Sequence, residues 1–343
     1  MRRIRLGRTG LTVSAVGFGG IPIQRLSDEQ AVTVVRHCLD LGVTFLDTAN
    51  AYITSEERIG RAISGRRQGL VLATKTQARD AEGVIRHLEL SLERLGVSTI
   101  DLYQFHCVST EDDFQKIIAP GGPLDAVMQA QRAGQVAHVG LSSHSLEIAL
   151  EAVKSGYFET IMFPFNLVAS EAAQELIPLA EAEDVGFIAM KPLAGGALSE
   201  AGLAFKYLRQ FPGILPIPGI EHAGEMDEIV ALMKGPAELS SAEQAAIQRM
   251  RAELGSRFCR RCGYCEPCPQ GVPTQALMIL DSMIKRMPAS KVRSDFAQAV
   301  EKAEACTECG ECEEKCPYGL PIPEMINEHV ALYHREMARH QAP

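Results

Sequence analysis

Residues 70–75 read LVLATK and residues 100–106 read IDLYQFH, two short apolar runs separated by residues 80–95, which have the periodicity of a helix. Short runs of apolar and β-branched residues are typical of buried strands, and a helix between two of them is typical of a parallel strand–helix–strand unit. Each run ends in a polar residue, Lys75 in the first and His106 in the second. This stretch predicts a parallel sheet whose strand ends carry chemically useful side chains.

The same alternation extends over most of the chain. Strands are expected at 13–20, 44–48, 70–75, 100–106, 138–143, 160–166, 186–192 and 214–219. Helices are expected at 28–41, 55–64, 80–95, 123–133, 145–155, 170–183, 200–210 and 223–234. Eight strand–helix pairs in about 250 residues are what a (β/α)8 barrel requires. We therefore expect an α/β TIM barrel, with residues 2–13 forming a small hairpin at its base.

Eight of the ten cysteines lie in two short runs near the C-terminus. The first run contains Cys259, Cys262, Cys265 and Cys268, and the second contains Cys306, Cys309, Cys312 and Cys316. Three thiolates at successive two-residue gaps match three iron corners of one [4Fe-4S] cube, and the Cys-Pro that ends each run directs a fourth thiolate elsewhere. The spacing therefore predicts two [4Fe-4S] clusters.

The fourth ligand of each cluster is expected to come from the other run. One cluster would then be held by Cys259, Cys262, Cys265 and Cys316, and its partner by Cys306, Cys309, Cys312 and Cys268. The second run has the bacterial ferredoxin spacing, whereas the first has two residues instead of three before its Cys-Pro, which leaves the exchange at Cys268 open. Helical periodicity at 274–287 and 294–305 predicts a mainly helical, ferredoxin-like domain around the clusters.

Zinc and disulfide bonds are the alternatives for these cysteines. Structural zinc prefers two separated cysteine pairs, whereas three closely spaced thiolates crowd a single tetrahedral ion. Disulfides need an oxidising compartment, and the first residues, MRRIRLGRTG, lack the apolar segment of a secretory signal. No apolar run is long enough to span a bilayer. We therefore expect a cytoplasmic protein with reduced thiols and no membrane partner.

Composition and charge indicate an ordered globular protein. Hydrophobic residues make up 46% of the chain and charged residues 22%, and the formal net charge is −9. Two bound clusters would make the protein more acidic still, which argues against nucleic acid as a partner. A helix at 241–253 is expected to end the barrel domain, residues 1–254, so that residues 255–343 form the cluster domain.

Polar residues at the ends of predicted strands form a candidate catalytic site. The carboxyl ends of the strands face the active site in a (β/α)8 barrel. Asp47, Lys75 and His106 end the second, third and fourth predicted strands, and Tyr52 follows in the loop after Asp47. Each residue alone could cap a helix or fill the core. Four such residues at successive strand ends favour a functional site.

Several segments resemble an aldo-keto reductase in their order and spacing: LGRTGLTVSAVGFGG, GVTFLDTANAY with SEERIG after it, LATKT, DLYQFH and VGLSSHS. The resemblance covers residues 1–235. With the two cysteine runs, the whole chain resembles the branch of that superfamily with a C-terminal 4Fe-4S dicluster domain. This resemblance implies that Asp47, Tyr52, Lys75 and His106 are the catalytic tetrad.

What the resemblance implies is a reversible, NAD(P)H-dependent reduction of an aldehyde or ketone to an alcohol. Tyr52 would donate a proton to the carbonyl oxygen, where negative charge develops as the hydride arrives. Lys75, held by Asp47, would lower the pKa of the tyrosine hydroxyl, and His106 would orient the carbonyl group.

Cofactor contacts are expected in the loops after the later strands. The candidates are Ser142, Ser143, Met190, Lys191, Gly195, Gly219 and Glu225. By resemblance, the serines would contact the nicotinamide carboxamide and Lys191 the pyrophosphate, whereas core packing is the alternative for Met190. After the last strand, Glu225 stands where many NADPH-dependent members carry an arginine. A carboxylate there repels a 2′-phosphate, which favours NADH over NADPH.

Two one-electron clusters beside a two-electron hydride site leave three functions open. In the first, the clusters are structural or exchange electrons with an external redox protein. In the second, they couple substrate or flavin chemistry to a ferredoxin, since a barrel mouth can hold a flavin phosphate without a short motif. In the third, the barrel binds a nucleotide as a redox sensor, against which the tetrad argues. Residues 107–122 and the cluster domain occupy the positions that choose the substrate, whose identity stays open.

Overall fold

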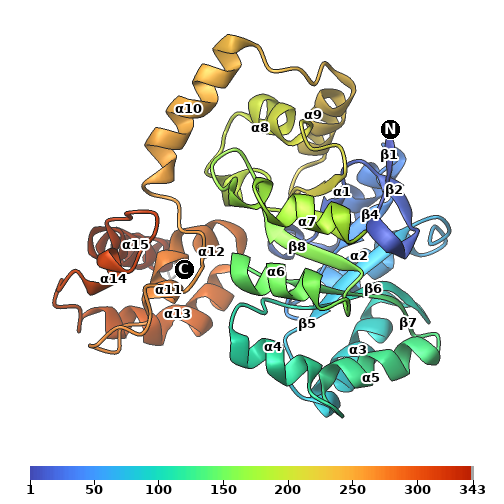
Figure 1. Cartoon of the computed structure of the whole chain (residues 1–343), viewed down its shortest axis with the longest axis horizontal. Coiled ribbons are helices and arrows are strands. Elements are labelled where there is room, and N and C mark those ends of the chain that lie inside the picture. Colours follow the sequence, from blue (N-terminus) through green and yellow to red (C-terminus); the bar gives the residue numbers. More distant parts are fainter. Residues whose placement is uncertain (341–343) are drawn as a thin grey trace. The chain divides into compact units, whose positions relative to one another are not determined.

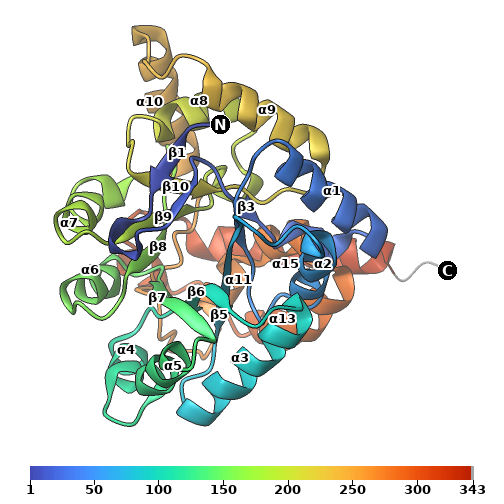
Figure 2. The same ribbon diagram turned by 90° about the vertical axis from the view of Figure 1, so that its right-hand side faces the viewer.

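The computed structural model describes residues 1–340 of the chain. These residues form two compact units, 1–240 and 241–340. In the first unit, eight parallel strands lie in chain order, β3 to β10, inside a set of helices (Figure 1). The succession of neighbouring strands can be followed in Figure 2. The predicted TIM barrel is therefore confirmed.

The elements of the barrel alternate along the chain as expected. The strands are β3 (Phe18–Gly19), β4 (Phe45–Asp47), β5 (Val71–Thr76), β6 (Ile100–Phe105), β7 (Val136–Ser142), β8 (Thr160–Pro164), β9 (Gly186–Met190) and β10 (Ile214–Ile217). The helices are α1 (Asp28–Asp40), α2 (Ser55–Ile63), α3 (Ala81–Leu95), α4 (Glu111–Ile118), α5 (Pro123–Arg132), α6 (Leu146–Lys154), α7 (Leu176–Ala182), α8 (Ala201–Leu208) and α9 (Ala223–Lys234).

The barrel closes between its first and last strands. Gly19 forms a parallel bridge with Gly219, and its N–H donates to the carbonyl of Pro218 at 2.8 Å. The Gly17 N–H donates to the Pro216 carbonyl at 2.9 Å. A β-carbon on Gly19 would lie 2.8 Å from the Pro218 oxygen, so only glycine permits this approach of the two strands.

A two-stranded hairpin covers the base of the barrel, as predicted. Strands β1 (Arg3–Arg5) and β2 (Thr12–Ser14) pair antiparallel, and Ile4 and Val13 of this hairpin belong to the hydrophobic cluster inside the barrel. The prediction of a single strand at 13–20 was wrong. The chain pairs with β1 over Thr12–Ser14 and then changes partner, so that only Phe18–Gly19 enters the barrel wall.

Alternation along the strands brings polar residues into the barrel. The interior hydrophobic cluster contains Phe45, Ala73 and Leu102 of β4, β5 and β6. Every second side chain of a strand points to the same face. Asp47, Lys75 and Gln104, each two residues further along, therefore also face inward, at the carboxyl ends of their strands. This alternation of side chains therefore places Asp47 and Lys75, two of the predicted catalytic residues, inside the barrel.

Helix α4 forms within residues 107–122, which the sequence analysis treated as a loop above the barrel. The Thr110 hydroxyl accepts the N–H of Asp113 at 3.2 Å and caps the first turn, which contains three acidic residues. Acidic side chains stabilise the positive end of a helix dipole. Phe114 and Ile117 are buried and attach the helix to the barrel.

The second unit is helical, as predicted for the cluster domain. Its helices are α10 (Ser241–Gly255), α11 (Thr274–Met278), α12 (Leu280–Arg286), α13 (Ala289–Ala303), α14 (Glu311–Glu314) and α15 (Ile322–Arg339). Leu277, Leu280, Val292 and Met325 belong to one hydrophobic core. The helix α15 was not anticipated. Helix α10 belongs to this unit, whereas the sequence analysis ended the barrel domain at residue 254; that boundary stays a prediction.

Within residues 1–340, no helix combines the length and apolar composition needed to cross a membrane.

Candidate active site

A buried ion pair lies at the carboxyl ends of β4 and β5. Lys75 Nζ donates to Asp47 Oδ2 at 2.7 Å and to the Thr48 carbonyl at 2.6 Å. The exposed fraction is 3% for Asp47 and 1% for Lys75, so water contributes almost nothing to the solvation of either charge. Gln104 of the neighbouring strand points its amide at Asp47 Oδ1, 3.5 Å away. Protein groups thus hold both charges in place.

Tyr52 and His106 lie beside this ion pair. Lys75 Nζ is 5.1 Å from the centre of the Tyr52 ring, and the Tyr52 and His106 rings meet edge to face with centres 5.8 Å apart. Tyr52 is half-buried and His106 is 8% exposed. The four residues predicted from the sequence are therefore brought together.

The charge state of Lys75 depends on its neighbours. Burial by itself would lower the pKa of this ammonium, but the negative charges of Asp47 and of an ionised Tyr52 outweigh burial and raise the pKa above its ordinary value. Lys75 is therefore a permanent cation near neutral pH. Its charge favours the ionised form of a phenol placed beside it.

Hydrogen bonds to β5 and α3 hold the loop that carries Tyr52. The Asn50 N–H donates to the Lys75 carbonyl at 3.0 Å, and the Asn50 carbonyl accepts from Arg94 at 3.2 Å. Arg94 also pairs with Glu56 at 3.3 Å, and Glu56 is only 1% exposed. This ion pair ties the start of α2 to α3 and restricts the loop over the barrel mouth.

Ser142 and Ser143, predicted to contact a carboxamide, are both buried at the end of β7. The Ser142 hydroxyl accepts the N–H of Cys107 at 2.9 Å. The Ser143 hydroxyl donates to the Ser145 carbonyl and accepts the Ser145 N–H, each at 3.0 Å. Both hydroxyls therefore hold loops at the barrel mouth, and their contact with a nucleotide stays a prediction.

The candidates after β9 lie in a tight turn. Met190 is half-buried and packs against the interior hydrophobic cluster, which agrees with the core-packing alternative. Lys191 has φ = 56°, in the left-handed region, and its carbonyl accepts from the amide of Asn166 at 2.9 Å. Gly195 has φ = 68°. Glycine adopts such a value without strain, whereas the left-handed conformation of Lys191 is strained, and strained backbone often occurs at functional sites.

Gly219 and Glu225 lie in the region after β10. Gly219 forms the bridge that closes the barrel. Glu225 is exposed, and its Oε2 accepts the N–H groups of Glu221 at 2.7 Å and of His222 at 2.8 Å. The carboxylate thus completes a capping box at the start of α9. Arg25 lies 3.5 Å from the Glu221 carboxylate, so one cation is present in this region.

The two cysteine loops of the second unit share one backbone conformation. The residues before Cys262 and Cys309 have φ values of 64° and 54°, and the glycines after these cysteines have φ values of 86° and 81°. Two successive departures into the left-handed region curl each loop. The two loops thus share a curled backbone, and the convergence of their thiols on a cluster stays a prediction.

The last cysteine of each run lies near the other run. Burial raises the pKa of Cys262, and Cys316 is among the neighbours that add to this rise, so these two thiols are close. The cysteines that line one narrow cavity are Cys265, Cys268, Cys306, Cys309 and Cys312. Since Cys265, of the other predicted ligand set, lines the same cavity, the exchange of fourth ligands, at Cys268 above all, stays a prediction.

The donor chemistry of this unit fits iron–sulfur clusters. No disulfide bond joins any of the eight cysteines of the two runs within the described residues. Burial, together with Cys259, Glu266 and Cys262, raises the pKa of Cys265 to about 12, so a bound cation is needed to form its thiolate. Among residues 1–340, no three His, Cys, Asp or Glu side chains converge closely enough to hold a single metal ion.

Comparison with known proteins assigns the family. A family model described as the aldo/keto reductase family matches residues 15–212, more than half of the chain. The chain belongs to the aldo/keto reductase family. A second model, described as a 4Fe-4S dicluster domain, matches residues 258–321 of this aldo/keto reductase. The protein is thus an oxidoreductase of the aldo/keto reductase type with a C-terminal 4Fe-4S dicluster domain.

The chain is similar to several known proteins, some of which have a named activity. The chain is 30% identical over 217 residues to the uncharacterized oxidoreductase YqkF of Bacillus subtilis, a match that covers 59% of this chain and 68% of the relative. It is equally identical over 217 residues to L-galactose dehydrogenase of Arabidopsis thaliana, covering 57% and 67%. The aldo-keto reductase from Klebsiella pneumoniae in complex with NADPH has the same fold, with a TM-score of 0.63, 23% identity and coverage of 73% and 95%.

Three residues of this aldo/keto reductase site were missed from the sequence. Thr48 offers its carbonyl to Lys75, Gln104 contacts Asp47, and Asn166 accepts the N–H groups of two loop residues while donating to Lys191. Gln104 stands two residues before His106 on the same strand. The period of two could have identified it, whereas the other two roles depend on loop conformation.

Proposed function

We propose that this aldo/keto reductase uses NAD(P)H to reduce an aldehyde or ketone to an alcohol, in a reversible reaction. The observation that carries the proposal is the buried Asp47–Lys75 ion pair with Tyr52 and His106 beside it. The bound nicotinamide cofactor would supply a hydride. The chain's own residues would then provide the proton and the orientation of the carbonyl group.

Tyr52 is the proposed proton donor. As negative charge develops on the carbonyl oxygen, a hydroxyl placed against that oxygen stabilises the transition state more than the ground state. A free phenol has a pKa of about 10, which is high for proton exchange at neutral pH. The permanent charge of Lys75, 5.1 Å from the ring centre, lowers the energy of the phenolate and so eases the proton transfer.

His106 is the proposed carbonyl-orienting residue. Its imidazole stands edge to face with the Tyr52 ring and follows β6, which is separated from β4 by β5 alone, so the two polar groups would lie on the same side of a bound carbonyl group. Holding the carbonyl group between two fixed donors restricts it to the reactive geometry. Asp47 would act through Lys75, since its carboxylate fixes the ammonium 2.7 Å away.

NADH is proposed as the preferred cofactor. The exposed Glu225 carboxylate at the start of α9 supports this preference, since it repels the 2′-phosphate that distinguishes NADPH. The conservative change Glu225→Gln keeps a capping oxygen and removes the charge. It should raise the ratio of kcat/KM with NADPH to kcat/KM with NADH. A wild-type protein that already prefers NADPH contradicts the preference.

Two [4Fe-4S] clusters are proposed for the second unit, with ligand sets that exchange Cys268 and Cys316 between the two runs. The lack of any disulfide among these cysteines in the described residues, and the contribution of Cys316 to the raised pKa of Cys262, support this assignment. Clusters held by reduced thiols fit a cytoplasmic protein. A second candidate function places the clusters in the electron path, with a ferredoxin or another redox protein as partner and a flavin as a possible mediator. The dicluster match supports this candidate.

An anaerobic titration tests the proposed function and separates it from the second candidate. NADH or NADPH is added to protein with both clusters loaded, first alone and then with a panel of simple aldehydes and ketones. The proposed function predicts unchanged cluster absorption with the cofactor alone and oxidation of NAD(P)H once a carbonyl is present. Bleaching of the clusters with a new paramagnetic signal, before any carbonyl is added, supports the second candidate. Cofactor binding with neither response contradicts both.

A further inference from the structure

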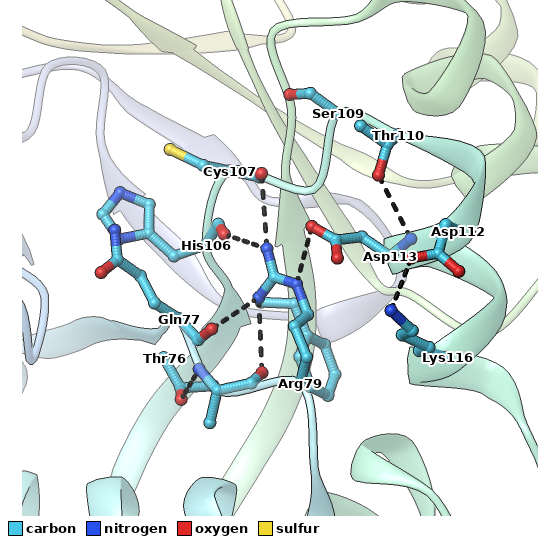
Figure 3. A network of polar contacts seen from close by, with 12 residues as sticks. Thr76, Gln77, Arg79, His106, Cys107, Ser109, Thr110, Asp112, Asp113 and Lys116 are labelled. Carbon is cyan, nitrogen blue, oxygen red and sulfur yellow. Dashed lines mark hydrogen bonds and ion pairs between the residues drawn. The ribbon is translucent and has the colours of Figure 1, made fainter. Parts of the chain in front are cut away.

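We propose that Arg79, in the loop between β5 and α3, is a positioning residue that fixes the backbone on which His106 is mounted. This inference rests on the proposed function, because it assigns His106 the orientation of a carbonyl group. Figure 3 shows the Arg79 guanidinium among carbonyl and carboxylate oxygens from three separate parts of the chain. They belong to its own loop, to the end of β6 and to helix α4.

The guanidinium donates hydrogen bonds to carbonyl groups in two directions and forms an ion pair in a third. Its Nη2 donates to the His106 carbonyl at 2.8 Å and lies 3.4 Å from the Cys107 carbonyl. Its Nη1 donates to the Gln77 carbonyl at 3.1 Å, and its Nε lies 3.1 Å from Asp113 Oδ2. A planar guanidinium is suited to this arrangement because its donors point in fixed directions.

Both ends of the His106 peptide unit are thereby held. The His106 N–H donates to the Thr76 carbonyl at 2.8 Å, as part of the strand pairing, and the His106 carbonyl is held by Arg79. These two bonds restrict the position of the α-carbon and the direction in which the His106 side chain leaves the backbone. Without Arg79, the His106 carbonyl would lose its bond to the guanidinium, and the loop after β6 would be held on its far side, by the Cys107 N–H donating to the Ser142 hydroxyl at 2.9 Å and the Val108 N–H donating to the Ser142 carbonyl at 2.8 Å.

The conformation of Cys107 makes this support necessary. Cys107 has φ = 54°, in the left-handed region that residues with a side chain rarely adopt. Its N–H is held by the Ser142 hydroxyl at 2.9 Å, and its carbonyl faces Arg79. Backbone strain of this kind persists only where the surroundings impose it. Removing Arg79 would let Cys107 relax to a common conformation and would rotate the peptide that follows His106.

Arg79→Met keeps the length of the side chain and removes every donor. With holoprotein and a carbonyl that wild type reduces, we expect kcat/KM for that carbonyl to fall about 10²-fold, because a misplacement near 1 Å has this effect. The dissociation constant of NAD(P)H should change little. Arg79→Lys should show an intermediate loss, since one ammonium cannot reach all three directions. Arg86 lies on helix α3, which follows the loop that contains Arg79. Arg86→Met removes this exposed arginine and should leave kcat/KM unchanged.

A second substitution distinguishes positioning from general stability. Glycine adopts positive φ values without strain, so Cys107→Gly should remove the strain that drives the turn to relax when Arg79 is absent. The double variant Arg79→Met, Cys107→Gly should therefore recover at least about tenfold of the lost kcat/KM. An Arg79→Met variant with wild-type kcat/KM overturns the proposal. The proposal is also overturned if Arg79→Met lowers both kcat/KM and the thermal midpoint and the added Cys107→Gly substitution fails to restore kcat/KM.

A measurement without turnover keeps this inference separate from the proposed function. The rate at which iodoacetamide labels Cys107 is followed by mass spectrometry of holoprotein under anaerobic conditions. Arg79→Met should label faster than wild type, since the turn at Cys107 is released, and Arg86→Met should label at the wild-type rate. Equal rates in all three proteins overturn the inference. If wild type reduces no carbonyl compound, the proposed function is contradicted. The labelling rates would then still test whether Arg79 fixes the backbone at His106 and Cys107.

Discussion

Lys75 Nζ lies 2.7 Å from Asp47 Oδ2, and the two side chains are almost fully buried inside the barrel. Each charge has lost its water, and the loss is offset by the partner, by the Thr48 carbonyl and by Gln104. Removing one partner of such a pair leaves an unpaired buried charge, which is far less favourable than removing both. Stability and the electrostatics of the proposed catalysis therefore depend on the same two residues.

The first prediction concerns the stability of this ion pair. Lys75→Met should lower the free energy of unfolding of the barrel by about 3–5 kcal/mol, because the Asp47 carboxylate stays buried without its partner. The double variant Asp47→Asn, Lys75→Met should lose less than the sum of the single variants. Denaturant unfolding followed by circular dichroism measures these differences. The exposed pair Glu82–Arg86 supplies the control, since its removal should change stability by less than about 0.5 kcal/mol. The prediction is contradicted if the double variant loses as much free energy of unfolding as the two single variants together.

The second prediction concerns the proton donor. Tyr52→Phe keeps the aromatic ring beside Lys75 and removes the hydroxyl, so kcat for carbonyl reduction should fall by about 10²–10⁴-fold. The dissociation constant of NAD(P)H and the thermal midpoint should stay near the wild-type values. Steady-state kinetics together with cofactor fluorescence would measure both quantities. The proton-donor role is excluded by a variant that keeps more than about a tenth of the wild-type kcat.

The third prediction identifies which cysteines share a cluster. Cys259→Ser and Cys316→Ser should each remove the same cluster, so the double variant should retain about four of about eight iron atoms per chain, as the singles do. Combining Cys316→Ser with Cys306→Ser should remove both clusters. Iron and sulfide analysis with paramagnetic resonance would show this pattern. Cys107→Ser, outside both runs, serves as the control. If the pair Cys259 and Cys316 removes all iron, the exchange of fourth ligands is wrong.

The fourth prediction is a dependence of stability on pH. Glu159 accepts from His138 Nδ1 at 2.8 Å and from the Val139 N–H at 3.1 Å. Burial alone would raise the pKa of Glu159, but these bonds outweigh burial and lower it below the ordinary value. A carboxyl with a lowered pKa in the folded state contributes stability that is present above its unfolded pKa, about 4.3, and is lost as pH falls through the folded pKa.

The measurement for Glu159 is the difference in thermal midpoint of the barrel between wild type and Glu159→Gln. It should be constant from pH 7 down to about 5 and should shrink below about 4.3. Glu82→Gln, on the exposed pair of α3, should show a small difference at every pH. A gap between wild type and Glu159→Gln that widens in acid would mean that the carboxyl is not stabilised in its ionised form.

The sequence was sufficient for the barrel and for the tetrad because both follow from short-range patterns. Asp47, Lys75 and His106 were found as polar residues ending apolar runs, and the geometry of a closed parallel barrel brings such ends together. Gln104 follows from the same period of two. The strand expected at 13–20 failed because a change of pairing partner leaves no trace in hydrophobicity.

The roles of loop residues could not be predicted from the sequence for a physical reason. Glu225 caps its own helix, with His222 at the position where serine or threonine usually announces a capping box. Arg79 acts on carbonyl groups, which every residue possesses and which therefore have no signature. The left-handed turn at Cys107 lacks the glycine that commonly marks such a conformation. Tertiary contacts decide all three.

Transfer of the hydride itself is the most direct test of the proposed reduction. Wild type and Tyr52→Phe are incubated under anaerobic conditions with NAD(P)D, deuterated at the transferring carbon of the nicotinamide, and with a carbonyl compound. The proposal predicts that wild type places one deuterium on the former carbonyl carbon of the alcohol, from one face of the nicotinamide, and that Tyr52→Phe forms at least about a hundredfold less of this product. Alcohol formed without deuterium, or formed equally by both proteins, would contradict it.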